Sequence, residues 1–359
     1  MKVLTVVGAR PQFVKAAVVS HVLRKKHTEI LVHTGQHFDY NMSELFFEEL
    51  YIPKPDYNLG ISGGTHGQMT GRMIEEIERV LMKEKPDVLL VYGDTNSTLA
   101  AALAAAKLGV PICHVEGGVR FYNSKNPEEI NRILTDHISS LILVCTQKAF
   151  ENLKKEGLAD RGVWVGDPMY DAFLKYSQVL DCSSIGLTLL DGSIKSVPES
   201  FYFMTCHRAE NTNEDNALYE ILKAMNSLDE KTIYPVHPRN KERVTRLNKK
   251  FGFENIMFCE PLGYLENVAL ERFAKKIVTD SGGVQREAFF ANVQCVTVID
   301  FPMWPETLVD NRNQLSAPIK EEIIEKLSRE QSIDRKYNPF GEGDAAKRIV
   351  SEIERFVLR

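Results

Sequence analysis

Short apolar segments alternate with helical patterns along this chain from end to end. The clearest unit is residues 276–299, where a β-branched run, a turn with two glycines, a helical pattern and a second apolar run follow one another. Such an alternation requires parallel sheets covered by helices on both faces. The sequence therefore predicts an α/β fold built from doubly wound, Rossmann-like sheets.

The apolar runs fall into two halves, and each half has its own set of predicted strands. We expect strands at 3–7, 29–33, 88–93, 112–115, 141–145, 163–166, 201–206, 232–236, 255–259, 277–279 and 293–299. Asp167-Pro168 breaks the pattern, and a polar, irregular stretch follows at about 181–200. We therefore predict an N-terminal domain of residues 1–168 and a C-terminal domain of residues 169–343. An amphipathic helix at 344–359 is expected to pack back on the first domain.

Length and composition exclude several classes of protein. With 359 residues, 43% of them hydrophobic and 26% charged, the chain can bury the cores of about two domains. Its net charge of −5 provides no positive field for nucleic acid or an anionic membrane. Six scattered cysteines without metal-ligand spacing are typical of a reduced compartment, and the N-terminal apolar run is too short for a signal peptide. We expect a cytoplasmic protein with no nucleic-acid or membrane partner.

The glycine turn at 280–283 has two interpretations. Gly282 and Gly283 leave no Cβ atoms at a helix start, so a phosphate can approach the first N–H groups and the positive end of the dipole. Equally, Ser281 can be an ordinary N-cap of a turn between a strand and a helix. The motif alone does not decide between them.

Polar residues recur just after predicted strands. Arg10 and Lys15 follow the first strand, and Asp94, Glu116 and His207 follow later ones. Since open α/β sheets bind ligands at the carboxyl ends of their strands, this recurrence predicts one extended site in a central cleft between two domains.

The residue types restrict the chemistry at that site. Glu128 and Arg132 are four residues apart at the start of a predicted helix and share one face. A P-loop and a nucleophile elbow are both missing from the sequence, which disfavours phosphoryl and acyl transfer. Acid/base carboxylates with a phosphate clamp fit a sugar nucleotide instead.

Seven motifs, in order along nearly the whole chain, resemble the non-hydrolysing UDP-N-acetylglucosamine 2-epimerases. They are GARPQ at 8–12, TGQH at 34–37, YGDTNS at 92–97, HVEGGVR at 114–120, PEEINR at 127–132, TCHRAEN at 205–211 and TDSGGVQRE at 279–287. Within that family the sequence is most similar to the branch that epimerises UDP-2,3-diacetamido-2,3-dideoxy-glucuronate. Trp304 stands where the N-acetylglucosamine enzymes have an arginine.

The resemblance implies a GT-B fold of two Rossmann-like domains and an isomerase, commonly a homodimer, that needs no metal or redox cofactor. Its substrate is a UDP-sugar used in polysaccharide synthesis. By resemblance, the acid/base and leaving-group residues are Asp94, Glu116, Glu128 and His207. UDP and substrate would be bound by Arg10, Lys15, Arg132, Arg208, Gly263, Ser281, Gly282, Gly283 and Glu287. Gln36, His37 and Gln68 lie where relatives have an activator site, although they can equally shape the active-site floor.

Four other functions are compatible with the sequence. The first is a UDP-N-acetylglucosamine 2-epimerase, and the second is a GT-B glycosyltransferase, which has no evident use for the carboxylates Asp94, Glu116 and Glu128. A hydrolysing epimerase would release free sugar and UDP, and a nucleotide-sugar binder would do no chemistry.

Overall fold

The chain folds into two compact units in the computed structural model, which describes residues 1–36, 44–123, 125–334 and 336–358. Unit 1 comprises Met1–Leu174 and Asn338–Arg359, and unit 2 comprises Lys175–Tyr337. The division falls inside helix α7 (Pro168–Tyr176), whereas the sequence places the boundary just after Pro168.

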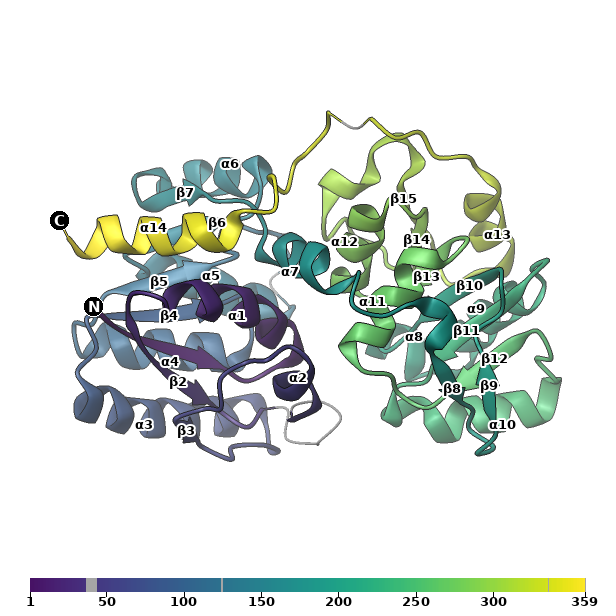
Figure 1. The fold of residues 1–359 in the computed structure, drawn as a ribbon, viewed down its shortest axis with the longest axis horizontal. Coiled ribbons are helices and arrows are strands. Elements are labelled where there is room, and N and C mark those ends of the chain that lie inside the picture. The colour runs from purple at the N-terminus through teal and green to yellow at the C-terminus, as the bar shows by residue number, and fades with distance from the viewer. Residues whose placement is uncertain (37–43, 124, 335, 359) are drawn as a thin grey trace. The chain divides into compact units, whose positions relative to one another are not determined.

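Unit 1 is built on a parallel sheet with the strand order β3-β2-β1-β4-β5-β6-β7 (Figure 1). Its strands are β1 (Lys2–Val7), β2 (Thr28–His33), β3 (Tyr57–Asn58), β4 (Val88–Tyr92), β5 (Ile112–Val115), β6 (Leu141–Val144) and β7 (Gly162–Trp164). Its helices are α1 (Arg10–Leu23), α2 (Glu44–Glu49), α3 (His66–Glu84), α4 (Asn96–Lys107), α5 (Pro127–Ile138), α6 (Gln147–Lys155) and α14 (Ala345–Val357).

Unit 2 is built on a second parallel sheet with the order β12-β11-β10-β13-β14-β15. Its strands are β10 (Phe201–Thr205), β11 (Lys231–Pro235), β12 (Ile256–Cys259), β13 (Ile277–Thr279), β14 (Cys295–Thr297) and β15 (Asn313–Leu315). Its helices are α8 (Ala209–Thr212), α9 (Asp215–Asn226), α10 (Lys241–Phe251), α11 (Tyr264–Phe273), α12 (Gly282–Ala291) and α13 (Lys320–Ser328).

In each sheet the strand order reverses beside the strand that comes first in the sequence, β1 in unit 1 and β10 in unit 2. β1 pairs with both β2 and β4, and β10 pairs with both β11 and β13. This order is that of the doubly wound nucleotide-binding fold, whose ligands bind at the carboxyl ends of the strands where the order reverses. The topology therefore gives each unit one predicted binding edge.

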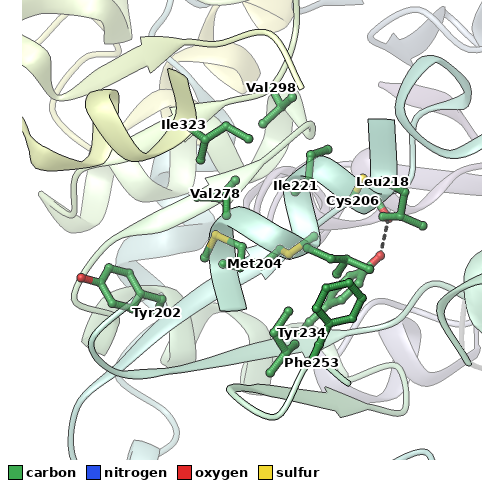
Figure 2. Close-up of a cluster of buried hydrophobic side chains, with 14 of the residues drawn as sticks. Tyr202, Met204, Cys206, Leu218, Ile221, Tyr234, Phe253, Val278, Val298 and Ile323 are labelled. Carbon is green, nitrogen blue, oxygen red and sulfur yellow. Dashed lines mark hydrogen bonds between the residues drawn. The ribbon is translucent and has the colours of Figure 1, made fainter. Parts of the chain in front are cut away.

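Apolar side chains on both faces of each sheet form the cores. In unit 2, Figure 2 shows residues from β10, β11, β13 and α9 gathered in one buried cluster. Tyr234 places its ring in this cluster, and its hydroxyl donates a hydrogen bond to the Cys206 carbonyl at 3.2 Å. A buried tyrosine is stable when its hydroxyl finds such a partner. The same bond fixes the end of β10, where His207 follows.

The structure confirms the predicted α/β fold, but β3 and β15 are not among the strands that the sequence predicted, and two segments differ from the interpretation. The stretch at 181–200 is not wholly irregular, because β8 (Gly186–Thr188) and β9 (Ile194–Ser196) pair there as an antiparallel hairpin. Pro168 does not end regular structure but begins α7, as a proline at the first helical position can. The last helix, α14, lies in unit 1, where His27 pairs with Glu354 at 2.8 Å.

The start of α14 depends on one carboxylate of α7. Asp171 accepts hydrogen bonds from the N–H groups of Ala345 and Ala346 at 3.0 and 2.8 Å. Burial, together with the negative charges of Asp167 and Asp344, raises the pKa of Asp171 to about 6, although the two N–H donors oppose this shift.

We expect Asp171→Asn to change the pH dependence of stability. Because folded Asp171 holds its proton more tightly than the unfolded chain does, its contribution to stability is present at low pH and is lost as the pH rises through about 6. The variant should therefore gain stability relative to the wild type between about pH 4 and about pH 7, as measured by urea unfolding. The exposed Asp160→Asn is the control and should show no such trend. A gain that shrinks on raising the pH would contradict the assignment.

Candidate active site

In unit 1, a buried lysine and a buried glutamate meet at the carboxyl edge of the sheet. Lys15 on α1 and Glu116 after β5 form an ion pair at 2.6 Å, with exposed side-chain fractions of 2% and 10%. A Cβ placed on Gly93, after β4, would lie 3.5 Å from Glu116 and 3.6 Å from Lys15. The two predicted site residues therefore lie together beside the turn that carries Asp94.

Glu116 adopts a backbone conformation that is costly for a residue other than glycine. Its φ is +69°, in the left-handed region, which costs about 1 kcal/mol or more. Gly117 and Gly118 follow, and a Cβ on Gly118 would lie 2.5 Å from the Ala149 carbonyl oxygen. Such strain persists only where the surroundings hold the backbone in place, so this loop presents Glu116 in one fixed direction.

Asp94 pairs with Arg132 of α5, and Arg132 also pairs with Glu129. The amide of Asn131 donates to the Asp94 carbonyl at 2.9 Å, so α5 holds both the main chain and the side chain of Asp94. Glu128 is exposed and takes no part in these ion pairs. The sequence placed Glu128 on the same face as Arg132, but the acid that contacts Arg132 on this helix is Glu129, three residues before it. The catalytic role of Glu128 stays a prediction.

Glu129 is the residue that the sequence interpretation missed in this motif. Its carboxylate is buried and accepts hydrogen bonds from the N–H groups of Phe121 and Tyr122 at 2.9 and 2.8 Å. Arg132 stacks over the Phe121 ring at 4.2 Å. Helical spacing permits pairing at three or four residues, so the sequence alone did not select Glu129 over Glu128.

The remaining predicted residues of unit 1 are spread around the same edge. Arg10 begins α1 and lies over the Phe46 ring at 4.6 Å. Gln36 accepts a hydrogen bond from the Ser97 hydroxyl at 2.8 Å at the start of α4. Gln68 completes a capping box with Thr65 at the start of α3, so the structure gives it a local role. His37 lies outside the described residues.

In unit 2, one buried aspartate organises the loop that follows β10. Asp280, after β13, accepts the N–H groups of His207 and Arg208 at 3.0 and 2.9 Å and lies 3.1 Å from the His207 ring. Burial alone would raise the pKa of Asp280, but the hydrogen bonds and the His207 ring lower it to about 2. Asn211 also donates to this carboxylate at 3.2 Å. The sequence interpretation had not recognised Asp280 as this acceptor.

Arg208 lies at the same carboxyl edge of the unit 2 sheet as the glycine turn at 280–283. Its Nε donates to the Asp280 carbonyl oxygen at 2.8 Å, and its guanidinium lies over the Phe301 ring at 5.5 Å. Its Nη2 lies 3.9 Å from the sulfur of Met303. A Cβ on Gly282 would lie 1.9 Å from that sulfur, so Met303 packs against the helix start that Arg208 flanks.

The glycine turn begins α12 as the sequence predicted. The Ser281 hydroxyl accepts the Val284 N–H at 3.4 Å, so Ser281 is the N-cap. Glu287 lies buried one turn later, and burial followed by the charge of Glu287 raises the pKa of Tyr264 well above its usual value. Gly263 immediately precedes Tyr264 and donates its N–H to Glu266 at 3.0 Å. The structure thus gathers His207, Arg208 and Ser281 at the switch point of unit 2, with Glu287 on the helix that begins there.

Among the residues that the structure describes, one group of potential metal ligands was found, and it lies in unit 1. Glu116, Cys145 and Asp167 are buried, and their ligand atoms lie within 4.8 Å of one another. The Lys15 ammonium already provides a positive charge 2.6 Å from Glu116. The site chemistry therefore does not require a cation here, and we assign no metal to it.

Two doubly wound parallel sheets, with charged residues at both switch points, define a GT-B-like α/β protein. The family model for UDP-N-acetylglucosamine 2-epimerase matches residues 21–354, and the chain belongs to this family. None of the helices in the described part of the chain is long and apolar enough to cross a membrane.

The chain is similar to relatives along its full length. It is 47% identical to a UDP-2,3-diacetamido-2,3-dideoxy-D-glucuronate 2-epimerase of Pseudomonas aeruginosa, with 99% of this chain and 100% of that protein covered. It is 46% identical to a UDP-N-acetylglucosamine 2-epimerase homolog of Methanococcus maripaludis, with 98% of each covered. The crystal structure of the Methanocaldococcus jannaschii UDP-GlcNAc 2-epimerase with UDP-GlcNAc and UDP aligns with a TM-score of 0.88 at 38% identity, covering 99% of this chain and 100% of that one.

We expect Asp280→Asn to destabilise unit 2, because an amide cannot replace a carboxylate that accepts several N–H groups. The loss at about pH 7 should be about 2–3 kcal/mol. Since the folded pKa of Asp280 is about 2, below the unfolded value of 3.8, its contribution is present at higher pH and is lost as the pH falls through about 2. Urea unfolding measures both effects.

The exposed Asp300→Asn is the matched control for this experiment and should leave stability unchanged. Equal stability of Asp280→Asn and the wild type at neutral pH would show that Asp280 does not organise the loop.

Proposed function

We propose that this member of the UDP-sugar 2-epimerases interconverts UDP-2,3-diacetamido-2,3-dideoxy-D-glucuronate and its manno isomer, for surface polysaccharide synthesis. The observation that carries this choice of sugar is the 47% identity to the Pseudomonas aeruginosa enzyme over essentially both whole chains. The relatives are UDP-sugar 2-epimerases, which are isomerases, so the chain is assigned to that class.

We assign the binding of UDP to unit 2. The start of α12 offers the N–H groups of a helix terminus, and Arg208 adds a guanidinium beside it. Phosphate oxygens are recognised well by this combination of N–H dipoles and a planar cation. The same groups stabilise the negative charge that develops on UDP as the bond from C1 breaks. Glu287, on the same helix, is assigned to the ribose, and Gly263 to the binding of UDP at the start of α11.

Unit 1 is assigned the proton transfers at the sugar. A base removes the proton from C2, the electrons of that bond form a C1–C2 double bond, and the C1–O bond breaks as UDP takes its electrons. Protonation of C2 on the opposite face and return of UDP to C1 give the epimer. Asp94, Glu116 and Glu128 are the candidate acids and bases, and His207 of unit 2 is assigned to the departing phosphate.

The cations of unit 1 keep the roles that the family resemblance implies: Arg10 and Lys15 of α1 are assigned to UDP, and Arg132 to the support of the substrate site. Lys15 also pairs with Glu116, and Arg132 with Asp94. An ionised carboxylate beside a cation is stabilised as a conjugate base and can return the proton later. Gln36, His37 and Gln68 are kept as the proposed activator site.

The second candidate function is that of a UDP-N-acetylglucosamine 2-epimerase. The description of the matching family and the name of the Methanocaldococcus jannaschii structure favour it. Trp304 is relevant to this choice, because it is buried and Arg286 stacks over its ring at 4.0 Å. The chain thus places a packed aromatic residue where the N-acetylglucosamine enzymes carry an arginine.

We further propose that the protein works in the cytoplasm as a homodimer. Its six cysteines are all buried thiols without disulfides, as in proteins of reducing compartments. The dimer is proposed by resemblance to the family. Size-exclusion chromatography with light scattering tests it.

We expect the enzyme to convert UDP-2,3-diacetamido-glucuronate to the manno isomer and, in deuterated water, to place deuterium at C2 of the product. Proton NMR measures both outcomes. A panel of UDP-sugars that lack the 6-carboxylate or the 3-acetamido group is the control, and each should react at a lower kcat/KM. Comparable turnover of UDP-N-acetylglucosamine would favour the second candidate, and free sugar in every turnover would indicate a hydrolysing enzyme.

We expect Gly283→Ala to weaken UDP binding without harming the fold. A Cβ there would be 3.6 Å from the Ser281 hydroxyl and 3.9 Å from Glu287, which are ordinary contacts, so nothing nearby in unit 2 requires a glycine. Alanine should stabilise α12 by up to about 1 kcal/mol, yet obstruct the approach of phosphate and raise the Kd of UDP about tenfold or more.

Calorimetric titration with UDP and thermal unfolding measure the two effects of this substitution. Gly71→Ala is the matched control, because Gly71 also lies in a helix with open space around its Cβ position, and its UDP affinity should be unchanged. An unchanged Kd of UDP in Gly283→Ala would show that the phosphate does not bind at this helix start.

A further inference from the structure

A completely buried histidine links the two turns that carry Asp94 and Glu116. His114 lies in β5 with no exposed surface. Its Nδ1 is 2.7 Å from the Asp136 carboxylate, and its Nε2 is 2.7 Å from the Gly93 carbonyl oxygen. A carbonyl oxygen only accepts, so Nε2 carries a hydrogen and donates it to Gly93. Nδ1 faces the Asp136 carboxylate, so both ring nitrogens have partners inside the unit.

The ring belongs to a network of buried and partly buried charged groups. Asp136 is also paired with Arg120 at 2.7 Å, and Arg120 makes a bidentate contact with Glu156 at 2.7 and 2.8 Å. Burial raises the pKa of Asp136, but the contacts with His114 and Arg120 outweigh burial and lower it. Pairing and hydrogen bonding of this kind are the conditions under which charged groups persist inside a protein.

One end of the network reaches the turn of Asp94. Gly93, whose carbonyl accepts from His114, is the residue just before Asp94. The next carbonyl, that of Asp94 itself, accepts from the Asn131 amide at 2.9 Å. Two donors from different elements therefore fix this turn.

The other end reaches the strained loop of Glu116. The second oxygen of Asp136 accepts the Gly118 N–H at 2.9 Å. A Cβ on Gly117 would lie 2.5 Å from Oδ1 of Asp136, so the main chain at residues 117 and 118 packs directly against the Asp136 carboxylate. This contact helps to hold the positive φ of Glu116.

We propose that His114 is a positioning residue whose ring ties the Asp94 turn to the Glu116 loop, so that the two carboxylates keep a fixed spacing during epimerisation. The inference rests on the proposed function only in naming the reaction. His114 does not touch the substrate in this role. A rigid ring with two diverging nitrogens is needed, because the amide of glutamine or asparagine has only one nitrogen.

Fixed spacing matters because a proton leaves one face of C2 and another arrives on the opposite face. A displacement of about 1 Å at a reacting group can cost about a hundredfold in rate. His114 is not among the residues assigned to UDP, so UDP binding should depend on it little. Loss of this residue should therefore lower kcat while KM and the Kd of UDP change little.

The first test is the hydrogen on Nε2 in the wild-type protein. Nitrogen-15 NMR of histidine-labelled protein should show one histidine whose Nε2 is protonated and hydrogen-bonded, and this signal should disappear in His114→Gln. A wild-type ring without a hydrogen on Nε2 would overturn the proposal. This measurement needs no substrate, so it stands even if the sugar or the reaction is assigned wrongly.

The second test is the split between turnover and binding. His114→Gln and His114→Asn should each lower kcat about a hundredfold, with KM and the Kd of UDP within about threefold of the wild type. His137→Gln is the matched control, since His137 is on α5, is about half exposed and touches the same network only through Glu156 at 3.3 Å. Full turnover in the folded His114 variants, or an equal loss in kcat and UDP affinity, would overturn the proposal.

Discussion

A buried aspartate paired with a histidine fixes the loops at the predicted binding edge in both units. In unit 1, Asp136 meets His114 and the Gly118 N–H, and in unit 2, Asp280 meets His207 and the N–H groups of two successive residues. An ionised carboxylate without such partners would be too costly to bury. The loops that carry the candidate site residues therefore supply the groups that neutralise these carboxylates. The position of each loop is thus coupled to the position of its carboxylate.

The two pairs nevertheless differ in their exposure, and this separates their roles. His114 has no exposed surface and uses both ring nitrogens inside the unit, whereas the side chain of His207 is 43% exposed. A ring held by a buried carboxylate on one side and reached by solvent on the other can meet a ligand. The same pairing thus supports a structural link in one unit and a candidate substrate contact in the other.

Periodicity predicted the sheets and their polar edges because strand and helix periods, and the carboxyl-edge rule, are local or topological. It did not predict the hairpin of β8 and β9, whose segment is polar. That segment also bridges through Leu189 to Cys259, which is distant in sequence. Nor did it distinguish Glu129 from Glu128, because the choice depends on N–H groups of the preceding loop. Buried acceptors such as Asp136 and Asp280 are visible only once the chain is folded.

The proposed reaction explains why the carboxylates of unit 1 are paired with cations. The proton at C2 is only weakly acidic, since no carbonyl adjoins that carbon, so stabilisation of the departing UDP has to lower most of the barrier. The base then needs little intrinsic strength but must act at two faces of one carbon in succession. Carboxylates held by Lys15 and Arg132 are fixed in direction, which suits positional accuracy rather than basicity. Geometry, more than proton affinity, is therefore the property that this edge of the sheet has to preserve.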